Sequence, residues 1–302
     1  MTISRTDLTE ANGYILEEQG SNVIQDLIAN SAVERFARRE AMASRTKSVP
    51  RFVGDAPEVV AEGAEIPASD PTLDEIVLTA KKYAQLMHIS EEDVNDSLVD
   101  TLSVYKREWA SRFARKFDNA TLGVAAVADG TDLVPYTSLY QAVYTDPNAA
   151  VSHIIQTGGA MSYDDLNNAL GLVEDSSKFD SANTVWMAHP KMLKEIRGMV
   201  KGNSDLVLPD PLAGTPGSLF GYPLVVSYGA AKSTAATDTP TGNPLLIVGN
   251  RQMLINGVRG GVESVVSRDA EFARDGVVLK TRIRRGFAVA DAGAFAIVEK
   301  TA

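Results

Sequence analysis

The sequence predicts an α+β protein in which one very long helix and a set of strands share a core. Three observations indicate this class. Apolar residues recur every three or four positions over about residues 91–127, strand-like segments follow one another after residue 244, and the stretch 54–74 has too few large apolar residues to form a core. A helical spine, a sheet and a stretch without a core of its own are therefore expected.

The composition limits the class of protein further. A chain of 302 residues that is 44% hydrophobic and 23% charged can bury one large core or two modest ones. It has no stretch of about 18 uncharged apolar residues and no apolar leader, so it signals neither membrane insertion nor secretion. The absence of cysteine excludes disulfides and thiol chemistry. A net charge of −10 argues against a dedicated nucleic-acid binder, because phosphate contacts need clustered lysine and arginine.

The first 82 residues are predicted to hold no core of their own. Residues 1–48 form a polar arm with short helical patches. Over residues 49–82, short strand-like pieces alternate with glycines and prolines. The part from Gly54 to Asp74 is expected to be either a disordered loop or an extended arm that packs on another molecule.

The clearest element is a helix over about residues 91–127. Ser90 is its expected N-cap, and the acidic residues of the first turn complement the positive end of the helix dipole. One continuous apolar stripe follows, made of Val94, Leu98, Leu102, Tyr105, Trp109, Phe113, Phe117, Ala120 and Val124. At 1.5 Å per residue such a helix is about 55 Å long, which suits a structural spine.

A smaller lobe of helices and strands is predicted after residue 160. Ser162 is expected to cap a helix, a buried strand spans 184–188, and a short basic helix spans 191–200. Gly221 permits a turn and Pro223 begins a strand, because proline fits only at the start or the edge of a sheet strand.

The rest of the chain is predicted to be rich in strands. A flexible surface loop over 232–244 comes first, and the expected strands are 245–249, 253–256, 262–266, 277–285 and 294–298. Within 277–285, Lys280, Arg282 and Arg284 alternate with apolar or neutral residues, as in a sheet with one face in water.

No group of residues has a coherent chemistry. The histidines His88, His153 and His189 do not lie at metal-ligand spacing. The glycine cluster 257–261 lies between two strands with no helix after it, which favours a hairpin turn over a phosphate cradle. We therefore predict no catalytic, cofactor-binding or metal-binding residues, and we do not expect an enzyme.

Five parts of the sequence, in this order, resemble the major capsid proteins of tailed bacteriophages, which have the Hong Kong 97 fold. Residues 59–70 are similar to the tip of the family's E-loop, and 86–90 to the junction into its spine helix. Residues 185–190 resemble the first strand of its A-domain, and 219–225 its "L-x-G-x-P-V" element, with Leu224 in place of the valine. The last part, 269–272 with 294–297, resembles the closing P-domain strands. The resemblance covers almost the whole chain.

The resemblance implies a Hong Kong 97-type capsid fold with an N-terminal arm, an extended E-loop, a P-domain that contains the spine helix, and an α/β A-domain. By position, the arm spans 1–48, the E-loop 49–82, the first part of the P-domain 83–183, the A-domain 184–264 and the closing P-domain strands 265–302. A flexible 232–244 loop would then be exposed close to the symmetry axis of a capsomer.

The resemblance also implies a function. Copies are expected to assemble as hexamers and pentamers into an icosahedral shell that encloses double-stranded DNA and contacts it non-specifically. The protein would be a virion component assembled in the host cytoplasm, without a membrane or cofactor, and with separate scaffolding, portal and decoration proteins as possible partners. The expected inter-subunit contacts are Pro57, Glu62, Glu65, Ile66, Asp70, Arg282 and Arg284. The group Arg282, Arg284 and Arg285 could equally face the DNA.

Two departures from the family pattern change these expectations. Some members cross-link their subunits through an isopeptide bond between an E-loop lysine and a P-domain asparagine. Residues 51–80 contain no lysine and 257–302 no asparagine, so we expect no autocatalytic cross-linking. Some members also carry a scaffolding prodomain ahead of the arm. This sequence lacks one, so if Met1 is the native start, assembly would depend on a separate scaffolding protein or on none.

Two other classes of function remain open on the sequence. An encapsulin-like nanocompartment protein resembles the same fold but encloses cargo enzymes, and a co-purifying cargo would distinguish it. An acidic α/β enzyme is the third class, and a deep pocket lined by converging carboxylates would support it.

Overall fold

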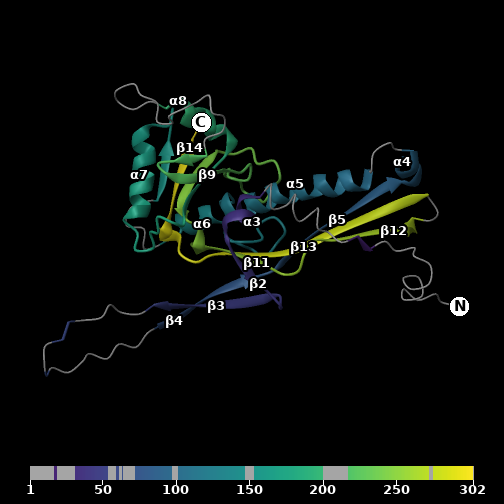
Figure 1. Ribbon diagram of the computed structural model, residues 1–302, viewed down its shortest axis with the longest axis horizontal. Helices are drawn as coiled ribbons and strands as arrows, with labels where there is room; N and C mark the ends of the chain where they lie inside the picture. The colour runs from purple at the N-terminus through teal and green to yellow at the C-terminus, as the bar shows by residue number, and fades with distance from the viewer. Residues whose placement is uncertain are drawn as a thin grey trace.

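The computed structural model describes residues 17–18, 31–53, 59–60, 63, 72–96, 101–146, 153–199, 217–271 and 275–301. Within this part, two six-stranded sheets and one two-stranded ribbon are joined by helices. Figure 1 shows a long sheet with a helix running along it, a helix-covered lobe at one end, and the ribbon projecting from the long sheet beside β2, Arg38–Ala41, and β11, Leu254–Val258. The mixed helix and sheet content confirms the predicted α+β class.

The long sheet is organised around strand β13, Gly276–Val289. Strand β5, Lys81–Ser90, runs antiparallel along one edge of β13. Strands β11, Leu254–Val258, and β12, Glu263–Glu271, both pair antiparallel with β13 as well. Two short strands complete the sheet, since β1, Glu17–Glu18, pairs with β12 and β2, Arg38–Ala41, pairs with β11.

The glycine cluster 257–261 does not form the predicted hairpin turn. Arg285 of β13 pairs with both Lys81 and Val258, and a strand has only two edges, so β11 lies opposite β5. By the same reasoning β12 lies opposite β5, because Arg282 pairs with both Ala84 and Glu263. Strands β11 and β12 therefore follow one edge of β13, and the glycines form an irregular interruption between them, in which Gly260 has a φ of +74°.

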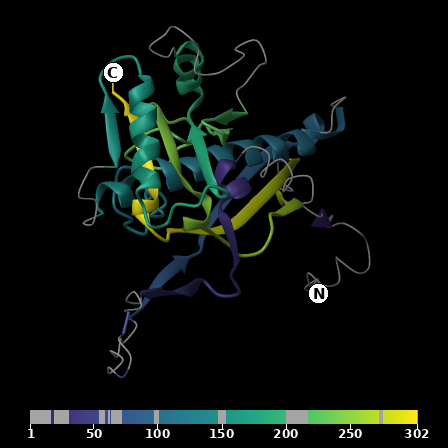
Figure 2. The same ribbon diagram turned by 60° about the vertical axis from the view of Figure 1, so that its left-hand side comes forward.

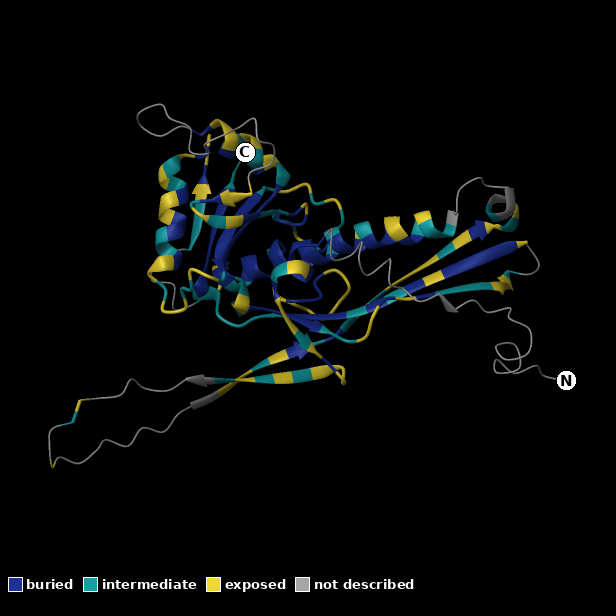
Figure 3. Cartoon of the chain, in the orientation of Figure 1, coloured by how far each residue is buried: buried dark blue, intermediate teal, exposed yellow. Residues whose placement is uncertain are grey.

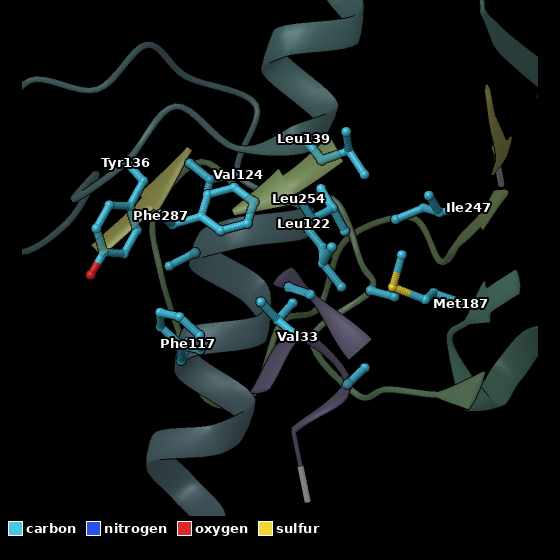
Figure 4. Packing of buried hydrophobic residues seen from close by; sticks show 14 of the residues in the cluster. Val33, Phe117, Leu122, Val124, Tyr136, Leu139, Met187, Ile247, Leu254 and Phe287 are labelled. Atoms are coloured by element: carbon cyan, nitrogen blue, oxygen red, sulfur yellow. The ribbon is translucent and has the colours of Figure 1, made fainter. Parts of the chain in front are cut away.

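Helix α5, Thr101–Leu122, lies against one face of the long sheet. Its aromatic residues stack at every fourth position, with ring centroids 5.4 Å apart for Trp109 and Phe113 and 5.6 Å apart for Phe113 and Phe117. Tyr83 of β5 meets Phe113 edge to face at 5.0 Å. The predicted stripe thus faces the core from Trp109 to Val124, as Figure 4 shows for Phe117 and its neighbours. Leu102 and Tyr105 are only partly buried, and Leu98 lies outside the described residues.

The long helix is shorter than the predicted span of 91–127. Helix α4, Glu91–Asp96, is described separately from α5, and residues 97–100 between them lie outside the described part. Helix α5 ends at Leu122 because the chain then packs against the segment after residue 230. A Cβ on Gly123 would lie only 2.1 Å from the carbonyl oxygen of Ala231, and Val124 pairs with Ser233.

The lobe is a six-stranded sheet with both faces covered. Its strand order is β6, Ile154–Thr157; β14, Phe295–Lys300; β10, Leu245–Asn250; β7, Thr184–Ala188; β9, Tyr222–Val226; and β8, Ser218–Leu219. Alternate residues enter two different cores: Val185 and Met187 pack in the core shared with α5, whereas Trp186 and Ala188 pack in the opposite one. Both faces are buried, which explains the continuous apolar runs of these strands.

Three helices cover the lobe. Helix α7, Tyr163–Glu174, begins with the predicted Ser162 cap, which forms a complete capping box with Asp165. Helix α8, Pro190–Gly198, has His189 as N-cap and a proline in its first turn. Helix α6, Leu139–Tyr144, was not predicted and packs on α5 and β14.

The two sheets draw their strands from several parts of the chain. Strand β11 lies within the segment 184–264 and belongs to the long sheet, whereas β6 and β14 lie outside that segment and belong to the lobe sheet. The physical reason is that β10, in the centre of the lobe sheet, pairs with β7 on one side and with β14 on the other, so the C-terminal strand is needed to cover it. Helix α7 packs on the lobe strands, as expected for the lobe predicted after residue 160.

The turn predicted at Gly221 is a tight hairpin between β8 and β9, where the sequence indicated only the entry from a loop into a strand. Leu219 pairs with Tyr222, so only Phe220 and Gly221 lie between the strands. Both have positive φ, +51° and +85°, which is the geometry of the two-residue hairpins that match strand twist. Phe220 contacts the rings of Tyr163 and Trp186, so it anchors the turn in the lobe core.

Strands β3, Thr46–Val53, and β4, Thr72–Thr79, form a ribbon that leaves the body of the molecule. Figure 2 shows it pointing away from both sheets. Leu78 and Ala80 pack at its base with Met42 and Ile255, whereas Val77 is 54% exposed. Figure 3 shows exposed and partly buried residues along its described part, in contrast to the buried lobe sheet.

We predict that Phe117→Ala destabilises the protein by about 3–5 kcal/mol, because it leaves a cavity where the helix, both sheets and α3, Ala32–Phe36, meet. Chemical unfolding followed by circular dichroism measures this. The matched control is Val104→Ala on the same helix, where the side chain is 47% exposed and the change should stay within about 0.5 kcal/mol. Equal effects of both changes would contradict the packing described here.

We predict that Gly123→Ala is strongly destabilising, because the new methyl group would overlap the Ala231 carbonyl and push the lobe away from the end of α5. Gly171→Ala, in helix α7 with no atom within 4 Å of the new Cβ, should instead stabilise the protein by about 0.5–1 kcal/mol. Thermal unfolding of the two variants should therefore shift in opposite directions. A shift in the same direction would disprove this account.

Candidate assembly interface

The sequence-predicted contact residues fall into two groups in the structure. Pro57, Glu62, Glu65, Ile66 and Asp70 lie outside the described residues. Arg282 and Arg284 lie on β13, in the long sheet. The second group can therefore be analysed in its surroundings.

The face of the long sheet opposite α5, which we call the outer face, carries most of its charge. Tyr83 contacts Phe113 of α5, so Lys82 and Ala84 on either side of it point to the outer face. Strand pairing places further residues on this face, because paired residues of antiparallel strands point the same way. They are Arg282 and Arg284, with Lys280 opposite Leu86 and Glu263 opposite Arg282.

The outer face is basic and partly apolar. The predicted alternation on β13 is confirmed, since Leu279, Thr281 and Ile283 are buried on the helix side. Leu86 is 57% exposed, an unusual fraction for a leucine in the middle of a strand. The face therefore combines lysine and arginine side chains with an exposed apolar residue.

Arg282 and Arg284 differ in their partners. Arg282 forms an ion pair with Glu263 on the neighbouring strand. Arg284, Lys82 and Lys280 form no ion pair with any residue that the structure describes. The sequence alone gives no reason to distinguish the two arginines, but the strand register does: Glu263 lies opposite Arg282, whereas Lys82 lies opposite Arg284. Of the two, Arg284 is thus the one without an ion-pair partner among the described residues.

A groove of about 470 Å³ runs between the edge of β5 and helix α5. Tyr83, Trp109 and Phe113 line it, together with charged residues of both signs: Lys81, Arg112, Lys116, Asp132 and Asp238. Lys82, whose side chain points to the outer face, borders the groove at the edge of β5. Sequence analysis missed this groove because its residues come from four separate segments. The lysine pair at 81–82 next to an alternating strand was its one visible signal.

The charge that complements these basic surfaces lies in the ribbon and its connecting segment. Residues 52–80 contain seven acidic residues and no lysine, arginine or histidine. In the described part, Asp74 pairs with Arg51 and Glu75 accepts a hydrogen bond from Ser48. Five of the seven, all in 54–70, lie outside the described residues: Asp55, Glu58, Glu62, Glu65 and Asp70.

A second polar group lies inside the molecule, where α3 joins α5. The Asp118 carboxylate is fully buried and accepts hydrogen bonds from the Ser31 hydroxyl at 2.5 Å, the Ser227 hydroxyl at 2.6 Å and the backbone N–H of Ala32 at 2.9 Å. Burial raises the pKa of Asp118 to about 6, although the hydrogen bonds from the serine hydroxyls and α3 amides lower it. Next to it, Asn119 donates to the carbonyl oxygens of Gly229 and Ala231.

Arg285 holds the other side of α3. Its guanidinium pairs with Glu34 and donates to the Gly260 carbonyl at 3.1 Å. Both charged side chains are almost completely buried, at 5% and 1% exposure, so the pair neutralises charge that would otherwise be costly in the core. Arg285 therefore serves the fold of the subunit, and it is not available for the DNA or neighbour contact that the sequence left open for it.

The three histidines have separate structural surroundings. His189 caps α8, and burial lowers its pKa to about 4. His153 contacts the Phe295 carbonyl at 2.8 Å, and His88 contacts Glu271 at 2.7 Å. Across the described segments, no three histidine or carboxylate side chains gather as metal ligands would. None of the described helices is both long and apolar enough to cross a membrane.

Comparison with known proteins places this architecture in a family. The model of the phage capsid family matches residues 12–300. A probable major capsid protein of Mycobacterium phage D29 is 26% identical over 180 residues, which cover 59% of this chain and 53% of that protein. Its counterpart in Mycobacterium phage L5 is 25% identical over 182 residues. The chain thus spans about half the length of the curated relatives that it matches.

Solved structures show the same fold at low identity. A chain from Mycobacterium phage Bobi matches with a TM-score of 0.68 at 17% identity, with 100% of both chains covered. A chain from Microbacterium phage Oxtober96 gives 0.66 at 20% identity, again over 100% of both chains. The capsid of a native GTA particle gives 0.66 at 19% identity over 98% of both. The predicted Hong Kong 97-type fold is confirmed, and the match over residues 12–300 shows that this chain belongs to the phage capsid family.

Proposed function

We propose that the protein is a shell subunit that assembles as hexamers and pentamers into an icosahedral capsid enclosing double-stranded DNA. Membership of the phage capsid family supports this, and the observation that carries it is the β3–β4 ribbon. A ribbon that leaves the subunit without a core of its own is marginally stable in isolation and gains its packing from a neighbouring copy. Contacts repeated by symmetry then close a shell.

The neighbour's outer face is the surface that the ribbon's connecting segment contacts in this proposal. The segment carries Glu62, Glu65 and Asp70, and the outer face carries Arg284, Lys82 and Lys280 without ion-pair partners among the described residues. Opposite charges on two such surfaces favour one docking orientation and speed the encounter of subunits. Pro57 and Ile66 of the segment would pack near the exposed Leu86. Arg282 would contribute through its pair with Glu263 at the rim.

The remaining assignments keep the segment roles given by the sequence. Residues 1–48 would act as the N-terminal arm, 49–82 as the E-loop, and α5 as the spine of the shell wall. Non-specific DNA contact, assembly in the host cytoplasm, residence in the virion, and separate scaffolding, portal and decoration partners follow from the same proposal. The family assignment supports a structural role in place of an enzymatic one.

Electron microscopy tests the proposal directly. Purified full-length protein, or particles from cells that express it, should show closed shells of uniform size by negative staining. Packaged double-stranded DNA of fixed length would support a viral capsid, and a co-purifying enzyme cargo would point to a nanocompartment instead. A protein that stays monomeric under all conditions, including with the scaffolding partner of its virus, would disprove the assembly role.

Charge reversal tests the docking surface. We predict that Arg284→Glu reduces the yield of shells at low salt by roughly tenfold or more, because it places like charges against the acidic segment. Light scattering during assembly measures the effect. The control is Lys194→Glu, the same charge change on exposed α8, which should leave the yield unchanged. Intact assembly of Arg284→Glu at low and high salt would show that Arg284 is not at the interface.

The sequence also predicts that no isopeptide bonds join the subunits. With no lysine in 51–80 and no asparagine in 257–302, assembled particles should dissociate into single chains on a denaturing gel after boiling. A ladder of covalent oligomers in that gel would show that another lysine and another asparagine or aspartate react.

A further inference from the structure

Asp118 differs from the other buried carboxylates of the described chain. Glu34 is neutralised by Arg285, and Glu299 by Lys232 at 2.9 Å. Asp118 is equally inaccessible to water but is held only by neutral donors. An ionised carboxylate in that position is stabilised by dipoles alone, so its charge state depends on how much water reaches it.

The donors to Asp118 come from two parts of the chain that are far apart in sequence. The Ser31 hydroxyl and the N–H groups of Ala32 and Val33 belong to the start of α3, where the N-terminal segment enters the core. The Ser227 hydroxyl belongs to the end of β9 in the lobe. If α3 leaves its place, Asp118 loses three of these four hydrogen bonds and the cover that keeps it dry.

We propose that Asp118 is a protonation-controlled clasp, which sets how firmly the root of the N-terminal segment is held on α5 and the lobe. The clasp is a property of one subunit and does not depend on the proposed shell. Detachment of α3 exposes the carboxyl group to water, whereas attachment buries it. Attachment is therefore coupled to proton binding at this one side chain.

The direction of the coupling follows from the pKa of Asp118. Burial raises it to about 6 when α3 is attached, against an ordinary value of 3.8 for a hydrated aspartate. The state with α3 attached binds the proton more tightly than the detached state. Protonation of Asp118 therefore stabilises attachment fully below pH 3.8, and this stabilisation is lost as the pH rises through 6. Between pH 5 and pH 7.5 the attachment equilibrium should weaken by about tenfold. The clasp tightens in acid and loosens at neutral pH.

Other ionisable groups near the clasp do not produce the same dependence. On α3, Glu34 is paired with Arg285, and Arg35 lies over the Phe36 ring. On α5, Arg115 lies over the Tyr228 ring, and Lys116 faces the groove beside β5. In the lobe, His189 contacts Tyr228, which follows Ser227 in the chain. The pKa of His189 is lowered to about 4, so its protonation weakens the fold as the pH falls, which is the opposite sign.

Hydrogen exchange of the full-length chain tests the proposal. Protection of the α3 amides, corrected for the intrinsic pH dependence of exchange, should fall about tenfold between pH 5 and pH 7.5. Light scattering at each pH verifies that the assembly state of the protein is the same across the series. In Asp118→Asn the protection should be independent of pH, whereas in the control His189→Asn, which keeps a capping side chain, the wild-type slope should persist. A flat wild-type profile, or an unchanged slope in Asp118→Asn, would overturn the clasp.

A second variant keeps the test decisive if Asp118→Asn fails to fold. Ser227→Ala removes one hydrogen bond from the ionised carboxylate, so the pKa of Asp118 should rise and the midpoint of the protection change should move to higher pH. Ser138→Ala, at a buried serine that donates to the Val124 carbonyl, should leave the midpoint where it is. The same midpoint in both serine variants would show that Asp118 does not control the attachment.

Discussion

The architecture depends on two adjacent buried side chains on helix α5, Asp118 and Asn119. Asp118 holds the start of α3 and the end of β9, and Asn119 holds the backbone at Gly229 and Ala231 and accepts from Ser233. A helix offers i and i+1 positions that point in different directions, so one turn can bind two separate segments. These hydrogen bonds fix the direction in which the two segments meet α5, which apolar packing alone does not specify.

Most of the element types could be predicted from the sequence, because they depend on local periodicity. The stripe from Trp109 to Phe117 and the Ser162 capping box needed only neighbouring residues. The end of α5 could not be predicted, because Gly123 stops the helix through contact with Ala231, more than a hundred positions away. The prediction for the glycine cluster 257–261 was wrong for the same reason. Glycines between two strands suggest a hairpin, and only the pairing of β11 and β12 with β13 shows that both strands lie along the same edge of β13.

The candidate interface shows a similar limit. Alternation along β13 placed Arg282 and Arg284 on one face, but it could not show that Glu263 lies opposite the first and Lys82 opposite the second. The arginine that remains without an ion-pair partner in the described chain is thus selected by pairing between strands distant in sequence. The role of Arg285 could not be predicted either. The sequence places it beside Arg282 and Arg284, but in the structure it is buried and neutralises Glu34, which is distant in sequence.

The position of β5 has a consequence for association before any shell is complete. In the described part of the chain, β5 pairs with a strand along one edge only, and a free strand edge of ten residues can template unwanted pairing with other copies. The strand carries Lys81 and Lys82 at one end and no acidic residue, so two such edges repel each other when they pair in parallel and in register, with lysine opposite lysine. In an antiparallel pair each lysine would lie opposite Ser90 or Ile89 of the other copy, so the lysines disfavour the parallel alignment and leave the antiparallel one open.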